Sequence, residues 1–264
     1  KDNLSTLIKR DNYIIYPESG ELASGLVGEG RLAEPENIVS YLEKYFEENQ
    51  PLLGKKILIT AGPTYEPIDP VRFIGNHSSG KMGFALAKRA KELGAQVTLI
   101  AGPVALDTPE GVDRINITTA NNLFEACKAH YKSQDIIIMA AAVADYTPKT
   151  VSDIKIKKKA DDWNIELEKT IDVLNWVGEN KQAEQFLVGF ALETNNEKEN
   201  AHKKLVKKNL DFIVLNSLQN KGAGFKHNTN QVTILTKENK TIDFELKSKE
   251  DVALDILMQV IEMN

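Results

Sequence analysis

The chain has 264 residues, of which 42% are hydrophobic and 27% are charged, and its formal net charge is −5. This composition is ordinary for a globular protein, and the negative charge argues against a nucleic-acid partner, which usually needs a basic surface. No apolar run approaches the roughly 20 residues of a membrane-spanning helix, so we expect no membrane partner. The single cysteine excludes a disulfide framework within the chain, which fits a reducing, cytoplasmic compartment.

The first 50 residues read as a separate, small unit. We expect a polar helix, a short strand over Tyr13–Tyr16 and a helix over Pro35–Glu47, while the glycines of Gly20–Leu32 indicate no regular structure between them. Such a unit is too small to bury a core of its own. The chain begins at Lys1 without a signal peptide pattern, and we expect it to belong to a longer protein.

Residues 51–264 form the second predicted domain, in which strands and helices alternate. Apolar runs predict strands over residues 56–60, 96–100, 114–117, 135–140, 186–191 and 211–215. Helical patterns lie over residues 81–93, 120–132 and 197–209. This order predicts an α/β fold with a Rossmann-like, doubly wound and mostly parallel sheet. The tail adds an antiparallel hairpin, 231–236 with 241–246, and a last helix over 249–263.

Ligands bind such sheets beyond the carboxyl ends of the strands, and the first strand is followed by an unusually long loop of about 20 residues. Asn76, Ser78, Ser79 and Gly80 end this loop just before a helix. Free N–H groups and hydroxyls at a helix N-terminus make an anion site. A plain N-cap would contribute about 1 kcal/mol, but would not explain the length of the loop.

Two familiar nucleotide motifs are incomplete here. Residues 75–81 match the first seven positions of the G-x-x-x-x-G-K-[ST] motif, but Met82 in the eighth position cannot place a hydroxyl on magnesium. The dinucleotide pattern G-x-G-x-x-G is absent.

A second candidate site follows the strand that ends near Met139. Residues 140–144 are small, which would let a flat base or a sugar approach the backbone, although tight helix–sheet packing explains them as well. Asp145 could bind a ribose, a base amino group or a metal, or it could be an ordinary turn residue.

The third candidate is a lysine-bearing flap. Lys155 and Lys157 alternate with Ile154 and Ile156, so a strand here would have one cationic and one apolar face, with residues 165–169 as its return strand. Either the flap places a lysine on a polyphosphate, or it is an edge strand protected by lysines.

A fourth candidate combines a strand end with a basic helix. Phe190 could stack on a base, and Lys204 and Lys208 belong to a lysine-rich helix face that could bind phosphate or simply be solvated. Cys127 lies in a helical pattern and is interpreted as a buried structural thiol. The four histidines lack the spacing of a structural zinc site.

Together these segments resemble phosphopantothenoylcysteine synthetase, in particular the C-terminal half of the bacterial fused decarboxylase/synthetase. The resemblance lies in residues 59–87, 140–146, 155–158, 189–196 and 204–211, in that order. It implies a ligase of coenzyme A biosynthesis that takes CTP, 4'-phosphopantothenate and cysteine as substrates, with Mg²⁺. The acid would first become an acyl-cytidylate, and the cysteine amine would then displace CMP.

The resemblance also implies roles for individual residues. Asn76 would hold the acyl group and its developing oxyanion, and Lys155 would act on the phosphates. The implied nucleotide contacts are Ser78, Ser79, Gly80, Met139, Ala140, Ala141, Asp145, Lys155, Ile171, Asp172, Val173, Leu174, Phe190, Lys204 and Lys208. The family often has Asn-Pro where this chain has Thr170-Ile171. The metal ligands stay unknown, because triphosphate and water can supply most of a magnesium shell. A homodimer is also implied, with a higher oligomer in the full-length fused protein.

The first unit resembles the end of the flavin-dependent decarboxylase half, through Gly28–Pro35. Many members have a cysteine where Ser24 stands, so we expect no decarboxylase activity and no FMN in this chain. Two alternatives to the ligase remain at this point: a nucleotide-dependent reductase that binds NADPH, and a regulatory module that binds CTP without turnover.

Overall fold

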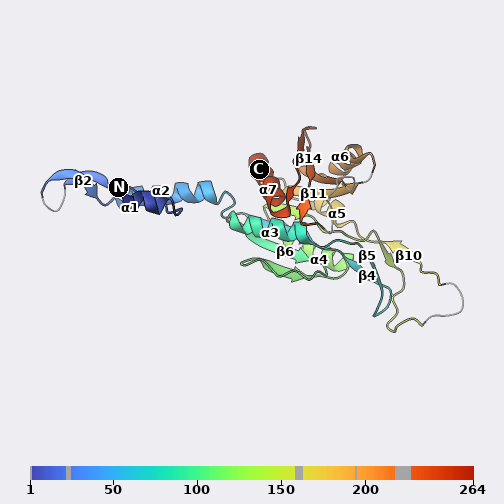
Figure 1. Cartoon of the computed structure of the whole chain (residues 1–264). Helices are drawn as coiled ribbons and strands as arrows, with labels where there is room; N and C mark the ends of the chain where they lie inside the picture. The colour runs from blue at the N-terminus through green and yellow to red at the C-terminus, as the bar shows by residue number, and fades with distance from the viewer. Residues whose placement is uncertain (1, 22–24, 158–162, 194, 218–226) are drawn as a thin grey trace. The chain divides into compact units, whose positions relative to one another are not determined.

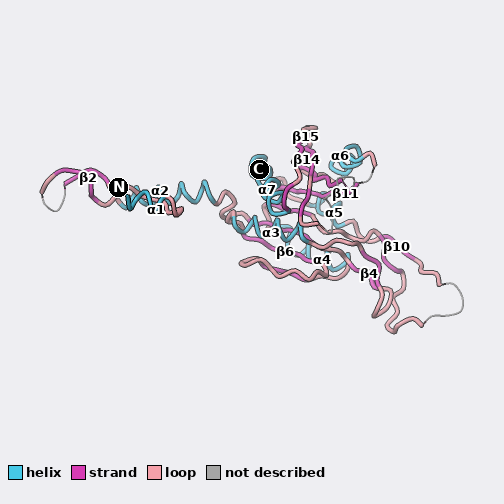
Figure 2. The backbone as a smooth tube through the Cα atoms, viewed as in Figure 1, coloured by secondary structure: helices cyan, strands magenta, loops and turns pink. Residues whose placement is uncertain are grey.

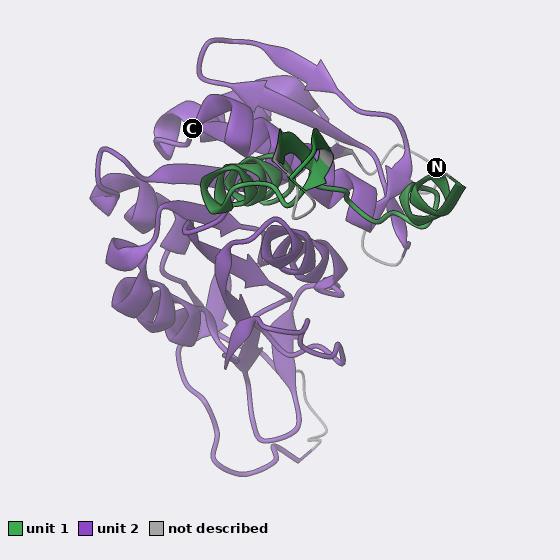
Figure 3. Ribbon diagram, turned by 90° about the vertical axis from the view of Figure 1, so that its left-hand side faces the viewer, with its two compact units in different colours: residues 1–51 green, residues 52–264 purple. Residues whose placement is uncertain are grey.

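The computed structural model describes residues 2–21, 25–157, 163–193, 195–217 and 227–264. The chain divides into two compact units, residues 1–51 and residues 52–264 (Figure 3). This boundary lies one residue from the one predicted from composition. Within the described ranges, no helix is both long and apolar enough to cross a membrane.

Unit 1 contains α1 (Asp2–Ile8), an antiparallel pair of β1 (Glu18–Glu21) and β2 (Val27–Arg31), and α2 (Pro35–Asn49). The helix at Pro35 is confirmed. The strand predicted over Tyr13–Tyr16 is wrong, and the glycine-rich stretch that followed it forms the two strands instead. Ala33 is the one buried residue among the described residues of this unit, which confirms that the unit does not bury a core of its own.

Unit 2 is built on an eight-stranded sheet in the order β15-β14-β12-β11-β8-β3-β6-β7 (Figure 1). The six strands from β12 to β7 run parallel. Strand β14 is antiparallel to β12, and β15 pairs antiparallel with β14, which confirms the predicted hairpin. Their bounds are β3 Lys56–Ala61, β6 Gln96–Ala101, β7 Asp113–Asn116, β8 Ile136–Met139, β11 Phe186–Glu193, β12 Phe212–Ser217, β14 Val232–Thr236 and β15 Thr241–Asp243. The chain order of the parallel strands reverses between β3 and β8, which makes that position the switch point of a doubly wound sheet.

Helices cover both faces of this sheet (Figure 2). The helices of unit 2 are α3 Lys81–Glu92, α4 Ala120–His130 with a 3₁₀ turn over Tyr131–Ser133, α5 Val173–Asn180, α6 Glu197–Lys207 and α7 Lys249–Met263. One core packs α3 and α7 against the sheet, and a second packs α4, α5 and α6 against the other face. Successive residues alternate between the two cores, Ile57 and Ile59 facing the first and Leu58 the second, as the period of two in a strand requires.

Helix α5 and three short antiparallel strand pairs were not predicted. Strands β4 (Tyr65–Pro67) and β5 (Phe73–Gly75) pair inside the long loop after β3. Strands β13 (Thr229–Asn230) and β16 (Lys247–Ser248) pair just before α7. The third strand pair corrects the predicted flap: residues 153–157 form no strand, and β10 (Leu167–Lys169) pairs with β9 (Tyr146–Pro148) instead. The remainder of the predicted flap, residues 158–162, lies outside the described residues.

Candidate functional site

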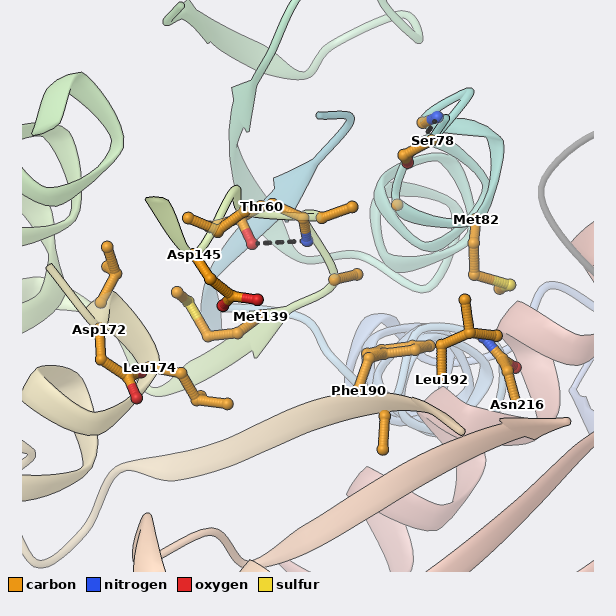
Figure 4. Close-up of a pocket in the computed structure, with 18 of the residues that line it drawn as sticks. Thr60, Ser78, Met82, Met139, Asp145, Asp172, Leu174, Phe190, Leu192 and Asn216 are labelled. Carbon is orange, nitrogen blue, oxygen red and sulfur yellow. Dashed lines mark hydrogen bonds between the residues drawn. The ribbon is translucent and has the colours of Figure 1, made fainter. Parts of the chain in front are cut away.

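A pocket of about 530 Å³ opens at the carboxyl ends of the parallel strands, where the switch point of the sheet predicts a ligand. Its wall takes residues from the ends of β3, β8, β11 and β12 and from the first turns of α3, α5 and α7. Fourteen of the predicted nucleotide contacts line it: Ser78, Ser79, Gly80, Met139, Ala140, Ala141, Asp145, Ile171, Asp172, Val173, Leu174, Phe190, Lys204 and Lys208. Figure 4 shows several of their side chains converging on one space.

The N-terminus of α3 forms one wall of this pocket. Gly80 is the N-cap residue and adopts a left-handed conformation with φ of 75°, which a side chain would strain. Its N–H donates to Ser78 Oγ at 3.4 Å. Gly83 packs against β3 so closely that a Cβ there would lie 2.5 Å from the Cβ of Ala61. The helix therefore brings its free N–H groups right up to the end of the central strand, where an anion is favoured.

The turn after β8 forms a second wall. Its backbone is fixed by hydrogen bonds from the loop after β3: the N–H of Ala141 donates to Thr60 Oγ1 at 3.1 Å (Figure 4), and the N–H of Ala144 donates to Thr64 Oγ1 at 2.9 Å. Asp145 follows this turn with an exposed side chain at the pocket. Small residues in this turn leave room for a flat group against the backbone.

Helices α5 and α6 contribute the charged end of the pocket. Asp172 caps α5 by accepting the N–H of Asn175 at 3.0 Å, and its carboxylate binds Lys208 Nζ at 2.8 Å. Burial opposes ionisation of Asp172, but the bonds from Lys208 and Asn175 outweigh it and lower the pKa of this carboxyl. Lys204 Nζ donates to the carbonyl of Phe190 at 2.8 Å. Burial, and then repulsion by Lys208, lower the pKa of Lys204.

Two predicted residues lie off the pocket wall. Both N–H groups of the Asn76 side chain have partners, the carbonyls of Ala142 at 3.1 Å and Val143 at 3.0 Å, so Asn76 reaches the pocket through the turn that it holds. Lys155 is exposed on the loop between β9 and β10 and does not line the pocket. Asp69 anchors that loop by accepting the N–H of Ile156 at 3.1 Å.

Sequence reasoning missed the side of the pocket opposite Asp145 and Asp172. This side is formed by Lys81, Met82, Asn216, Asn230 and Lys249. Figure 4 shows Met82 and Asn216 across the cavity from the two aspartates. Asn216 lies near the end of β12, so the rule that ligands bind beyond strand ends could have found it. Lys249 carries no such signal, because it reads as a solvated residue in the first turn of a helix.

Cys127 does not line the pocket. Burial raises the pKa of the Cys127 thiol to about 12, which fits the structural role predicted for it. Among the residues that the structure describes, no three His, Cys, Asp or Glu side chains gather as a metal site would require.

A known family has this architecture and sequence. Residues 52–263 match the model of the DNA/pantothenate metabolism flavoprotein C-terminal domain, and the chain belongs to that family. A solved structure, the C-terminal domain of coenzyme A biosynthesis bifunctional protein CoaBC, is 45% identical and superposes with a TM-score of 0.70, covering 81% of this chain and 97% of that one.

Two curated relatives match almost the whole chain. The bifunctional protein CoaBC of Bacillus subtilis (strain 168) is 49% identical over 100% of this chain and 66% of its own length. A protein named cysteine/cysteine sulfinic acid decarboxylase, from an unknown prokaryotic organism, is 50% identical over 99% of this chain and 74% of its own length. The chain thus spans about two thirds to three quarters of these relatives, and their names describe different activities.

Proposed function

We propose that unit 2 is a phosphopantothenate–cysteine ligase of coenzyme A biosynthesis that uses CTP. The observation that carries this proposal is the pocket itself: residues from four separate segments of the family motif line one cavity at the switch point of the sheet. The relatives named for coenzyme A biosynthesis support it further. The two alternatives, an NADPH-dependent reductase and a module that binds CTP without turnover, become outcomes of the test below.

The proposed reaction has two steps. A carboxylate does not react with an amine until it carries a leaving group. An oxygen of the phosphopantothenate carboxylate therefore attacks the α-phosphorus of CTP, which forms an acyl-cytidylate and releases pyrophosphate. The cysteine amine then attacks the acyl carbon, the amide bond forms, and CMP leaves with the oxygen that came from the carboxylate. Catalysis would rest on positioning both substrates and on stabilising negative charge.

The pocket offers groups for each part of the nucleotide. The backbone of Met139–Ala141 and the side chains of Val173 and Leu174 offer a flat surface for the base, and Asp145 a partner for the ribose. Lys204, Lys208 and the free N–H groups at the start of α3 supply positive potential for phosphates. The choice of CTP over ATP comes from the family resemblance.

The two proposed catalytic residues, Asn76 and Lys155, are not among the residues that line the pocket. Asn76 positions the Ala142–Val143 turn, and its carbonyl oxygen is the group left to face the acyl substrate once both N–H groups are engaged. This differs from the oxyanion role implied by the family, which needs a free N–H. Lys155 does not line the pocket, and Asp69 accepts the N–H of the next residue, Ile156. The part of Lys155 in activation therefore stays a prediction.

Magnesium fits this pocket as a companion of the triphosphate. Asp145 and Asp172 are both exposed at the cavity, but Asp172 is engaged by Lys208 and by the cap of α5. One carboxylate with phosphate oxygens and water is the usual shell of this ion. When bound, Mg²⁺ would neutralise phosphate charge. A cytoplasmic location and a homodimer remain predictions from the sequence.

Pyrophosphate release tests the proposed function. We expect the purified chain to release pyrophosphate from CTP with magnesium, faster than from ATP, and only when 4'-phosphopantothenate is present. NADPH oxidation without a need for magnesium would favour the reductase instead. Binding of CTP with no release under any combination of substrates would favour the regulatory module.

A further inference from the structure

The side of the pocket opposite Asp145 and Asp172 has two lysines and two asparagines whose role the family resemblance does not assign. Lys249, the first residue of α7, is only 7% exposed although lysine usually keeps its ammonium group in water. Its Nζ donates to the carbonyl of His227 at 2.8 Å. Lys81, the first residue of α3, donates from Nζ to Asn228 Oδ1 at 2.7 Å. Two consecutive residues, His227 and Asn228, thus hold both ammonium groups at one wall of the pocket.

The two like charges are close enough to disfavour each other. Burial, and then the charge of Lys81, lower the pKa of Lys249 to about 8. Among the described residues that line the pocket, the acidic ones are Asp145 and Asp172, on its other side. Glu250, the next residue of α7, binds Lys88 at 2.8 Å. The wall therefore concentrates positive charge in a place where an anion would relieve the repulsion.

The asparagines beside these lysines are also incompletely used. Asn230 is 2% exposed, and its Nδ2 donates to Asn216 Oδ1 at 3.0 Å. Its Oδ1 has no hydrogen-bond partner within the described part of the chain. A buried acceptor without a donor costs stability, so this oxygen suits an N–H or O–H group elsewhere on the ligand that carries the phosphate.

We propose that Lys249 and Lys81, with Asn230 and Asn216 beside them, form a phosphate-binding subsite for a substrate of the ligase. The phosphate would lie between the two ammonium groups, next to the first turn of α3, whose N–H groups favour the same charge. Its source depends on the proposed function, which supplies two phosphate-bearing substrates: the phosphate monoester of 4'-phosphopantothenate and the β- and γ-phosphates of CTP. Both present the same chemistry to the wall.

Calorimetric titration of the whole chain separates these sources. Lys249→Met removes the ammonium group but keeps most of the side chain's volume. Lys88→Met is the matched control, because Lys88 lies on α3, does not line the pocket and pairs with Glu250 of α7. Each protein is titrated with 4'-phosphopantothenate and pantothenate, and separately with CTP and CMP.

We expect Lys249→Met to weaken one phosphate ligand about 10-fold or more relative to Lys88→Met. A loss for 4'-phosphopantothenate with pantothenate unchanged assigns the acid's phosphate, and a loss for CTP with CMP unchanged assigns the nucleotide's. Lys249→Arg, which keeps the charge, should bind the affected ligand better than Lys249→Met does. Equal affinities for Lys249→Met and Lys88→Met, within about two-fold for every ligand, would overturn the subsite.

A titration with pyrophosphate keeps this test independent of the ligase. If the wild-type chain binds neither 4'-phosphopantothenate nor CTP, the proposed function fails while the subsite can still be decided. The subsite then requires that pyrophosphate bind to the wild type and to Lys88→Met and bind at least about 10-fold more weakly to Lys249→Met. Equal binding to all three, or no binding to the wild type, would overturn it. Thermal unfolding of each variant shows whether it is folded at the temperature of the titration.

Discussion

At one side of the pocket Lys208 is paired with Asp172 at 2.8 Å, whereas at the other side Lys249 and Lys81 present like charges to the same cavity. In the first arrangement the ammonium group is paired with a carboxylate, whereas Lys249 and Lys81 donate to uncharged oxygen atoms of His227 and Asn228. The second keeps a buried cation whose pKa is lowered, which costs stability in the empty protein. Anion-binding sites often have this second arrangement, because the bound anion offsets the stability that the empty site loses. The pair of Lys208 and Asp172 thus stabilises the pocket wall, whereas Lys249 and Lys81 add positive charge that a bound anion would neutralise.

The largest expected effect concerns Lys204, the half-buried lysine of α6 that lines the pocket. Lys204→Met should reduce kcat/KM for CTP by roughly 30-fold, since a hydrogen-bonded charge facing a phosphate contributes about 2 kcal/mol. Lys203→Met is the matched control: Lys203 precedes Lys204, is exposed and pairs with Glu199 at 2.6 Å. Steady-state kinetics of both variants checks this. A similar loss in the two would mean that the charge of the helix as a whole matters, and not the pocket-facing group.

The second prediction contrasts stabilities. Lys249→Met should raise the free energy of unfolding at pH 7, by about 1 kcal/mol after allowing for the lost bond to His227, because it removes a desolvated cation. Lys208→Met should lower it by about 0.5–1 kcal/mol, because Asp172 loses its partner. Urea unfolding measures both. A loss of stability in Lys249→Met as large as that in Lys208→Met would show that the two sides do not differ as described.

The third prediction follows from the sign of the pKa shift. The pKa of Lys249 is about 8 in the folded chain and about 10.4 when unfolded, so the unfolded chain binds more protons between these values. The contribution of Lys249 to stability should therefore rise with pH from about 8 to about 10.4. The nearby charged groups are Lys81, Glu250 and Asp251, of which Glu250 is already paired with Lys88.

Comparing wild type with Lys249→Met across this range isolates the effect, because all other groups are shared. The stability advantage of the variant should shrink as the pH rises from about 8 towards about 10.4. An advantage that stayed constant over this range would contradict the lowered pKa.

The smallest expected effect concerns the cap of α5. Asp172→Asn should cost only about 0.5–1 kcal/mol at pH 7, because asparagine also caps helices and only the ion pair with Lys208 is lost. Since the pKa of Asp172 is lowered, its contribution in the wild type should be present at neutral pH and disappear as the pH falls through the folded pKa. Urea unfolding of both proteins at neutral and acidic pH measures it. A difference that persisted fully in acid would place the effect in the cap.

Much of the fold could be predicted because local signals and long-range packing agree. The strand at Lys56, the helix closed by Gly94 and the hairpin of β14 and β15 each combine a regular apolar pattern with a turn residue. Helix α5 was missed because its segment was interpreted only as a nucleotide-contacting turn. The strand pairing predicted for the flap is wrong because alternation at Lys155 and Lys157 shows which side each residue would face, but not which strand residues 165–169 will pair with.

The residues of the candidate site also divide into those that local sequence signals predict and those that only tertiary contacts bring to the pocket. Residues that follow a parallel strand, such as Asp145 and Phe190, could be placed at the pocket by the strand-end rule alone. Lys249 could not, because its burial depends on the pairing of Thr229–Asn230 with Lys247–Ser248 and on the packing of α3 against α7, which bring distant parts of the chain together. A charge that is buried by tertiary contacts leaves no local pattern.

Oxygen tracing is the measurement that tests the ligase assignment most directly. The 4'-phosphopantothenate is labelled with ¹⁸O in its carboxylate and incubated with the chain, CTP, cysteine and magnesium, and the products are examined by mass spectrometry. The account predicts that each amide formed is accompanied by one CMP that carries one ¹⁸O atom. Amide formation with unlabelled CMP, or with the label in free phosphate, would contradict activation through an acyl-cytidylate, and the absence of any amide would contradict the ligase itself.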